Sequence, residues 1–195
     1  GEDQDLSHDR ITALRLGVSL NRCLTGCLGI DFQFSRGIDI ASRSQGDVGK
    51  GTPLSRSSGK NNFSHFNLDT TYAVALDKNL EFNINTGGQL SLDDLLNSEQ
   101  SSITGPDKLS GFTSGSISGD ESWYFRGQLN YKKKLNNKLT LTPYAYGAAG
   151  VSYTLTPTAT ENRATAAKSI GLGLKMDGID NYFFDKNISA KVEYS

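Results

Sequence analysis

The chain has 195 residues, with 20 Lys and Arg against 21 Asp and Glu and a formal net charge of -1. Nucleic acid is excluded as a partner, because neutralising phosphates requires clustered Lys and Arg. No apolar run approaches the 18 or so residues of a membrane-spanning helix. The hydrophobic fraction is 36%, below the roughly 45–50% of globular chains. A helical membrane protein and a large conventional core are therefore not expected.

The predicted elements are strands, because apolar and polar residues alternate with period 2 and no long window has helical spacing. In chain order the predicted strands are Ile11–Leu20, Ile30–Ile40, Phe66–Leu76, Leu80–Leu90, Ser122–Leu135, Lys138–Thr154, Ser169–Met176 and Ile188–Tyr194. These are about eight strands of about ten residues, the length of a tilted membrane-crossing strand. The pattern predicts an all-β, antiparallel fold.

The strand at 122–135 shows the alternation most clearly. Its apolar face carries Trp123, Phe125, Gly127, Leu129 and Tyr131. Its polar face carries Tyr124, Arg126, Gln128, Asn130 and Lys132. A soluble antiparallel sandwich would also alternate, but long strands dense in Asn, Gln, Thr, Lys and Asp favour the water-filled interior of a transmembrane β-barrel.

The connections between these strands alternate in length. Asp77–Asn79 and Asn136–Asn137 are tight, turn-forming clusters, whereas residues 42–62, 91–121 and 155–168 are long, polar and rich in Gly and Ser. Outer-membrane barrels have this arrangement of short periplasmic turns and long external loops.

Residues that could carry chemistry are few. Only His8 and His65 are present, and neither stands at metal-ligand spacing from another His or Cys. We therefore predict no catalytic residue, metal or cofactor. Cys23 and Cys27 lie four apart in the turn between the first two strands. In an oxidising compartment they could form a disulfide, and otherwise they are two free thiols.

Five motifs occur in order in the region that joins the fourth and fifth predicted strands. They are Gly88–Ser91, Leu95–Gln100, Gly111–Phe112, Ser118–Asp120 and Tyr124–Arg126. In order and spacing they resemble the C-terminal barrel of the two-partner secretion transporters, the haemolysin and filamentous-haemagglutinin secretion/activation family of the Omp85 superfamily. The similarity extends to Phe34–Gly37, Pro143–Tyr144 and Ser169–Leu174.

The resemblance implies that residues 91–121 form a long loop that folds into the barrel lumen. Its tip would be Leu109, Ser110, Gly111 and Phe112, and its return Ser118, Gly119 and Asp120. Arg126, Tyr144, Tyr146 and Ala148 would face the lumen.

Two departures from the family concern residues that work together. The family has an Arg at the loop tip where this chain has Ser110, and the strand Asp that pairs with that Arg corresponds to Ala148. Because both partners are replaced, no lone buried charge remains. We therefore expect Phe112 and hydrogen bonds to hold the loop in place of an ion pair.

The function implied by the resemblance is translocation of a large unfolded exoprotein, such as a haemolysin or adhesin, across the outer membrane of a Gram-negative bacterium. The expected partners are the secreted exoprotein and outer-membrane lipid, and neither enzymatic activity nor a cofactor is implied. Two alternatives are a small passive porin or adhesin-type barrel, and a soluble all-β binding module.

The number of predicted strands is smaller than that of a complete family barrel. About eight strands correspond to the C-terminal half of a family barrel of about sixteen, and nothing in residues 1–195 resembles the family's periplasmic domains. Because lipid does not tolerate open strand edges, we expect a partial barrel domain that pairs with the missing half or with another chain.

Overall fold

The computed structural model describes residues 11–38, 55–136, 139–180 and 186–194. These residues form a nine-stranded sheet and a two-stranded ribbon, and every strand pairing within them is antiparallel. In the same ranges, no helix is long and apolar enough to cross a membrane. The predicted all-β, antiparallel fold is confirmed.

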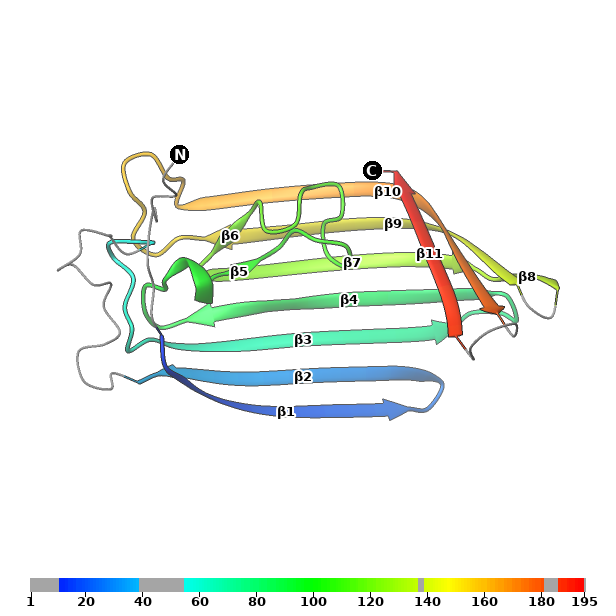
Figure 1. Cartoon of the computed structure of the whole chain (residues 1–195), viewed down its shortest axis with the longest axis horizontal. Coiled ribbons are helices and arrows are strands. Elements are labelled where there is room, and N and C mark those ends of the chain that lie inside the picture. Colours follow the sequence, from blue (N-terminus) through cyan, green and yellow to red (C-terminus); the bar gives the residue numbers. More distant parts are fainter. Residues whose placement is uncertain (1–10, 39–54, 137–138, 181–185, 195) are drawn as a thin grey trace.

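The large sheet is a meander whose strands lie side by side nearly in chain order (Figure 1). Its strands are β1 (Ala13–Cys23), β2 (Gly26–Gly37), β3 (Ser64–Ala75), β4 (Leu80–Ser91), β7 (Glu121–Tyr131), β8 (Lys133–Asn136), β9 (Leu139–Tyr153), β10 (Ala164–Asp180) and β11 (Lys186–Tyr194). The order across the sheet is β1-β2-β3-β4-β7-β9-β10-β11, and β8 pairs with β9.

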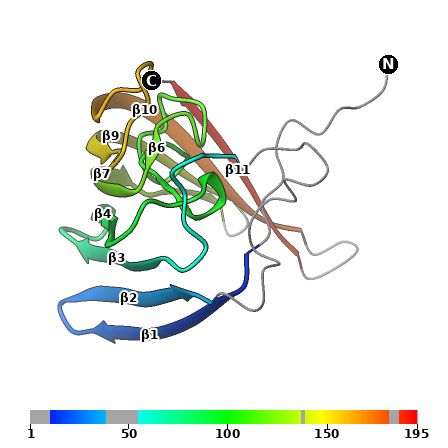
Figure 2. The same ribbon diagram turned by 90° about the vertical axis from the view of Figure 1, so that its left-hand side faces the viewer.

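The long connection between β4 and β7 has short elements of its own. It contains the 3₁₀ helix η2 (Asn97–Glu99) and the ribbon formed by β5 (Ser101–Ser102) and β6 (Ser118–Gly119). The view from the side shows the sheet as an open arc, with this connection on its concave side (Figure 2).

The register gathers apolar side chains on one face and polar ones on the other. Leu16 of β1 pairs with Phe34, Phe34 pairs with Phe66, and Phe66 pairs with Leu90, so apolar rows run across the sheet. Because residues two apart share a face, the intervening positions form a polar row. We call the convex, apolar side the outer face and the concave, polar side the inner face.

Most predicted strands differ from the observed ones by a few residues at their ends, and two of the differences are informative. The strand at 122–135 is divided into β7 and β8, because the N–H of Lys132 donates to the carbonyl of Asn79 (2.7 Å) and leaves the ladder. Residues 164–168, predicted as loop, belong to β10, because they pair with 149–153 of β9. Among the predicted positions, Ile40, residues 42–54, Asn137 and Lys138 lie outside the described residues.

The two ends of the sheet differ in their connections. At one end, the turn end, four residues, 76–79, join β3 to β4, which confirms the predicted turn at Asp77–Asn79. Cys23 and Cys27 also lie at the turn end, where they are register partners and form a disulfide. The other three connections, from β2 to β3, from β4 to β7 and from β9 to β10, leave and re-enter the sheet at the opposite end, the loop end.

The two faces predict opposite responses to a charge on β1. Val18 is 70% exposed on the outer face, halfway along β1, so Val18→Arg should destabilise the protein in a bilayer by about 2–4 kcal/mol. Ser19→Arg places the same charge on the inner face beside Asp31, the hydrogen-bond partner of Ser19, and should cost little. Unfolding in urea from lipid vesicles measures both, and equal costs would contradict the assignment of faces.

Candidate functional site

The core of the described structure lies between the β4–β7 connection and the inner face. Ile103 and Leu109 of the connection are fully buried. They pack with inner-face residues of β7 and β9, namely Tyr124, Tyr144, Tyr146 and Ala148. The loop therefore supplies the apolar layer that covers the aromatic part of the concave wall.

The tip of this loop is bound by Arg126 of β7. One guanidinium nitrogen, Nη1, donates to the Lys108 carbonyl (3.1 Å) and to the Ser110 hydroxyl (2.6 Å). Nη2 donates to Gln128 Oε1 (2.8 Å) and to Glu193 Oε2 of β11 (3.3 Å). Arg126 is only 2% exposed, so these acceptors replace the water that the cation loses on burial.

Two tyrosines of β9 complete the surroundings of Arg126. Its guanidinium carbon lies 3.7 Å from the ring centroid of Tyr146, a cation–π arrangement. The Tyr144 hydroxyl donates to the same Glu193 carboxylate oxygen (2.6 Å). Glycines on β10 make room for both rings, because a Cβ at Gly173 would lie 2.2 Å from the Tyr144 ring and one at Gly171 2.6 Å from that of Tyr146.

A second cation lies beside Arg126 on the loop itself. Lys108 Nζ donates to the Ser102 carbonyl (2.7 Å) and lies 4.8 Å from the Tyr124 ring centroid. The Tyr124 hydroxyl donates to Asp69 of β3 (3.0 Å). Lys108 thus links the loop tip, through an aromatic ring, to a carboxylate on the opposite side of β4.

The predicted tip residues have different environments. Leu109 is buried and Ser110 bonds Arg126, whereas Gly111 is exposed and Phe112 is 39% exposed. The expectation that Phe112 holds the loop is not what the structure shows: Leu109 fills that role, because its backbone bridges to Thr104 and turns its side chain into the core.

Ala148 lies on the inner face, in the wall of the site. It is the register partner of Arg126 in the β7–β9 pairing. Arg126 thus stands opposite the position at which the family resemblance places an Asp. In this chain the cation belongs to the strand and the loop tip supplies the acceptors.

Helix η2 forms a second anchor of the loop. Glu99 accepts two hydrogen bonds from Arg15 of β1 (2.6 and 2.7 Å) and one from His65 Nε2 of β3 (3.3 Å). Burial alone would raise the pKa of Glu99, but the hydrogen bonds from His65 and Arg15 outweigh it and lower that pKa. The carboxylate therefore holds η2 against two strands in its ionised form.

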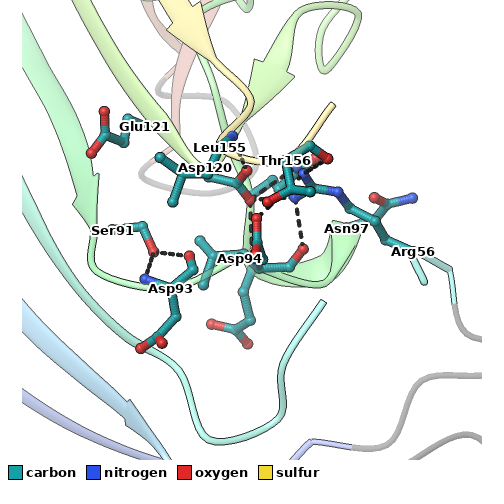
Figure 3. A network of polar contacts seen from close by, with 12 residues as sticks. Arg56, Ser91, Asp93, Asp94, Asn97, Asp120, Glu121, Leu155 and Thr156 are labelled. Carbon is teal, nitrogen blue, oxygen red and sulfur yellow. Dashed lines mark hydrogen bonds and ion pairs between the residues drawn. The ribbon is translucent and has the colours of Figure 1, made fainter. Parts of the chain in front are cut away.

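The third anchor is a polar network at the loop end, centred on Asp120 (Figure 3). Its carboxylate accepts from Arg56 Nη1 (2.5 Å) and from the backbone N–H groups of Leu95 (2.9 Å) and Leu155 (2.8 Å). Burial raises the pKa of Asp120, but these donors more than offset it, so the pKa lies below its ordinary value. Of the other predicted return residues, Gly119 is buried and Ser118 is exposed.

Arg56 adds a third loop, the one between β2 and β3, to this network. It donates to the carbonyls of Leu95 (3.2 Å) and Thr156 (3.1 Å), so three loops meet at one buried guanidinium. Sequence reasoning missed Arg56, because it lies in a polar loop and belongs to no recognisable motif. Asp120, which the motifs place in the loop return, indicates that a cation or several donors lie nearby but not which residue supplies them.

The described residues contain no group of three His, Cys, Asp or Glu that could hold a metal ion. The site is an arrangement of one loop, three polar anchors and an aromatic wall. Together these contacts position the loop on the inner face.

Comparisons with known proteins give two findings. The sequence profile of the family described as haemolysin secretion/activation protein ShlB/FhaC/HecB matches residues 1–176. The chain is also similar in structure to CdiB from Escherichia coli, with a TM-score of 0.69 and 18% sequence identity over 98% of this chain. The chain spans 38% of the length of that protein. Among curated proteins, none matches the sequence.

The Arg126 contacts predict the behaviour of the loop tip. Arg126→Gln removes the charge-assisted hydrogen bonds to Lys108 and Ser110, each about 1.5–3 kcal/mol, and should release the tip. Trypsin cleavage after Lys108 should then accelerate about tenfold or more. Lys132→Gln, which removes another inner-face cation paired with Glu81, is the matched control. Unchanged cleavage in Arg126→Gln would contradict this role.

The Asp120 network predicts a pH-dependent contribution to stability. Asp120→Ala leaves Arg56 buried without its carboxylate and should cost about 3–5 kcal/mol. Asp94→Ala should cost much less, since its carboxylate lies 3.9 Å from Arg56.

The sign of the pH effect follows from the lowered pKa of Asp120. The contribution of Asp120 to the free energy of unfolding is present above the ordinary pKa of Asp, and it is lost as the pH falls through the lowered pKa of Asp120. Thermal unfolding should therefore show the wild type and Asp120→Ala converging below about pH 4. A difference independent of pH would contradict it.

Proposed function

Because the chain belongs to the haemolysin secretion/activation protein family of ShlB, FhaC and HecB, we propose that it is part of an outer-membrane transporter that secretes and activates a large exoprotein by two-partner secretion. The membrane is the outer membrane of a Gram-negative bacterium. The partners are the unfolded exoprotein on the inner face and lipid on the outer face.

The observation that carries the proposal is the loop tip bound to the concave wall by Arg126. A loop that only covers the rim of a barrel needs no buried cation on the wall. Here Arg126 bonds the tip through both Lys108 and Ser110, and Leu109 is fully buried. The loop occupies the inner face of the conduit, where it can control the passage of a chain.

The rest of the inner face suits an unfolded polypeptide. Several of its charged groups are engaged with each other or with polar neighbours, as in the pairs Arg126–Glu193, Lys132–Glu81 and Ser19–Asp31. Between them lie neutral amides and hydroxyls such as Asn83, Asn85 and Thr71. Where the described part of the wall is made of such paired charges and neutral polar groups, it would hold a passing chain only weakly.

No residue has a catalytic role in this proposal. Transport needs no bond chemistry, and folding of the exoprotein outside the cell supplies the direction. A passive porin or adhesin-type barrel would not need the buried tip, and a soluble binding module would not leave Val18, Leu172 and Ile170 exposed on one continuous face.

Secretion by the full-length transporter tests the proposal. Deletion of Leu109–Phe112 removes the Arg126 contact and the buried Leu109. A loss of about 1.4 kcal/mol in the free energy of loop docking shifts the equilibrium between docked and undocked loop tenfold. The amount of exoprotein in the medium should therefore fall about tenfold or more. Deletion of Thr158–Asn162 from the exposed tip of the β9–β10 loop is the matched control and should leave secretion intact.

Two results would contradict the proposal. Undiminished secretion in the Leu109–Phe112 deletion would show that the tip has no part in transport. Passive flux of small solutes without any secretion of the exoprotein by the wild type would favour the porin. Heat-modifiable migration in gels confirms in each case that the barrel is folded.

A further inference from the structure

A cavity lies between the loop tip and β11. Its volume is about 280 Å³. Pro106, Ser110 and Phe112 line it from the loop, and Glu193 lines it from β11. Because the loop lies on the concave side of the sheet (Figure 2) and Glu193 bonds the inner-face residue Arg126, the cavity belongs to the inside of the arc. Its occupant must come from there.

Phe112 is the apolar residue of the tip that docking of the loop leaves exposed. Its N–H donates to the Leu109 carbonyl (3.4 Å) and closes a tight turn. Within this turn Leu109 is fully buried, whereas Phe112 is 39% exposed. The turn therefore directs one apolar side chain into the core and leaves the other at the cavity. A ring beside a concave space is the arrangement by which ligand sites bind apolar groups.

The polar groups of the cavity favour an occupant that is uncharged and carries a carbonyl. Ser110 accepts a hydrogen bond from Arg126 (2.6 Å), so its own O–H can donate in turn, and a peptide carbonyl is a suitable acceptor. The Glu193 carboxylate is engaged by Arg126 and by the Tyr144 hydroxyl. A charged side chain would therefore lose its hydration in the cavity without a comparable gain.

An extended polypeptide presents the groups that this cavity can bind. Its side chains alternate in direction, so those on one side are about 7 Å apart, and backbone carbonyls lie between them. One side chain can enter beside Phe112 and Pro106 while a neighbouring carbonyl accepts from Ser110. An aromatic side chain gains most, because it can also stack on the Phe112 ring.

We propose that this cavity binds one uncharged apolar side chain of the extended exoprotein, an aromatic one above all, and that Phe112 selects it. The inference rests on the proposed function, which supplies the extended chain. It assigns Phe112 a contact with the substrate in place of a part in holding the loop. A single ring binds weakly, so the side chain is released and the next one can follow.

Photocrosslinking with a peptide tests the site in the full-length transporter, purified in detergent. The probe is a Gly/Ser peptide with one central benzoylphenylalanine, and the crosslinked residues are mapped by mass spectrometry. We expect saturable crosslinking within residues 105–114. Unlabelled peptides with Phe, Asp or Lys at the central position are the competitors, and the Phe peptide should compete best.

Substitutions at the tip separate binding from loop docking. Phe112→Ala should weaken peptide binding about threefold to tenfold, the effect of one aromatic pair, and Phe112→Tyr should retain it. Leu155→Ala is the matched control, since Leu155 is 36% exposed and does not line the cavity. Trypsin cleavage after Lys108 should stay at the wild-type rate in Phe112→Ala, because Leu109 and Ser110 still hold the tip.

Equal competition by the three peptides, or better competition by the Lys peptide, would overturn the proposal. So would unchanged binding in Phe112→Ala, or faster trypsin cleavage in that variant. Heat-modifiable migration shows that each variant is folded, and secretion is measured on the same proteins. Wild-type secretion without a role of Phe112 in peptide binding removes this site alone. Peptide binding at the tip without any secretion removes the proposed function and leaves the cavity as a peptide site.

Discussion

The structure depends on a guanidinium that has been removed from water. Arg126 sits in the wall of a curved sheet at 2% exposure, and a buried cation is stable only when acceptors surround it. Those acceptors come from three parts of the chain: Gln128 on its own strand, Glu193 on β11, and the tip of the loop between β4 and β7. Without the loop, Nη1 of Arg126 loses both of its acceptors, and this favours the position of the loop on the inner face.

In this chain the cation that binds the loop tip lies on a strand, within the motif Tyr124–Arg126 that the resemblance includes. The family resemblance places a cation on the loop tip and a carboxylate on the wall. Here the tip has Ser110 and the wall has Ala148, while Arg126, directly opposite Ala148, carries the charge. Lys108 adds a cation near the tip, and it meets an aromatic ring and, through Tyr124, the carboxylate of Asp69. The same loop position is stabilised by a different distribution of charge.

Most of the fold was predictable from the sequence, because period-2 alternation reports directly which face each residue occupies. The start of β10 was not, since Ala164–Lys168 has little apolar contrast and is a strand only through its pairing with β9. Leu109, Ser110 and Asp120 could be found from motifs. Arg56 could not, because its partner Asp120 is 64 residues away, and no local pattern records so distant a contact.

The three anchors of the loop also determine when it can dock. Arg15 and Glu99 are separated by 84 residues and Arg56 and Asp120 by 64, whereas Arg126 and Ser110 of the loop tip are separated by only 16. Contacts of high sequence separation carry a large loop-closure entropy, whereas the hairpins of the meander close locally. The strands from β1 to β7 must already be paired before Arg15, His65 and Arg126 stand together on one face. The loop therefore docks after these strands have paired, and its docking records that this part of the wall is complete.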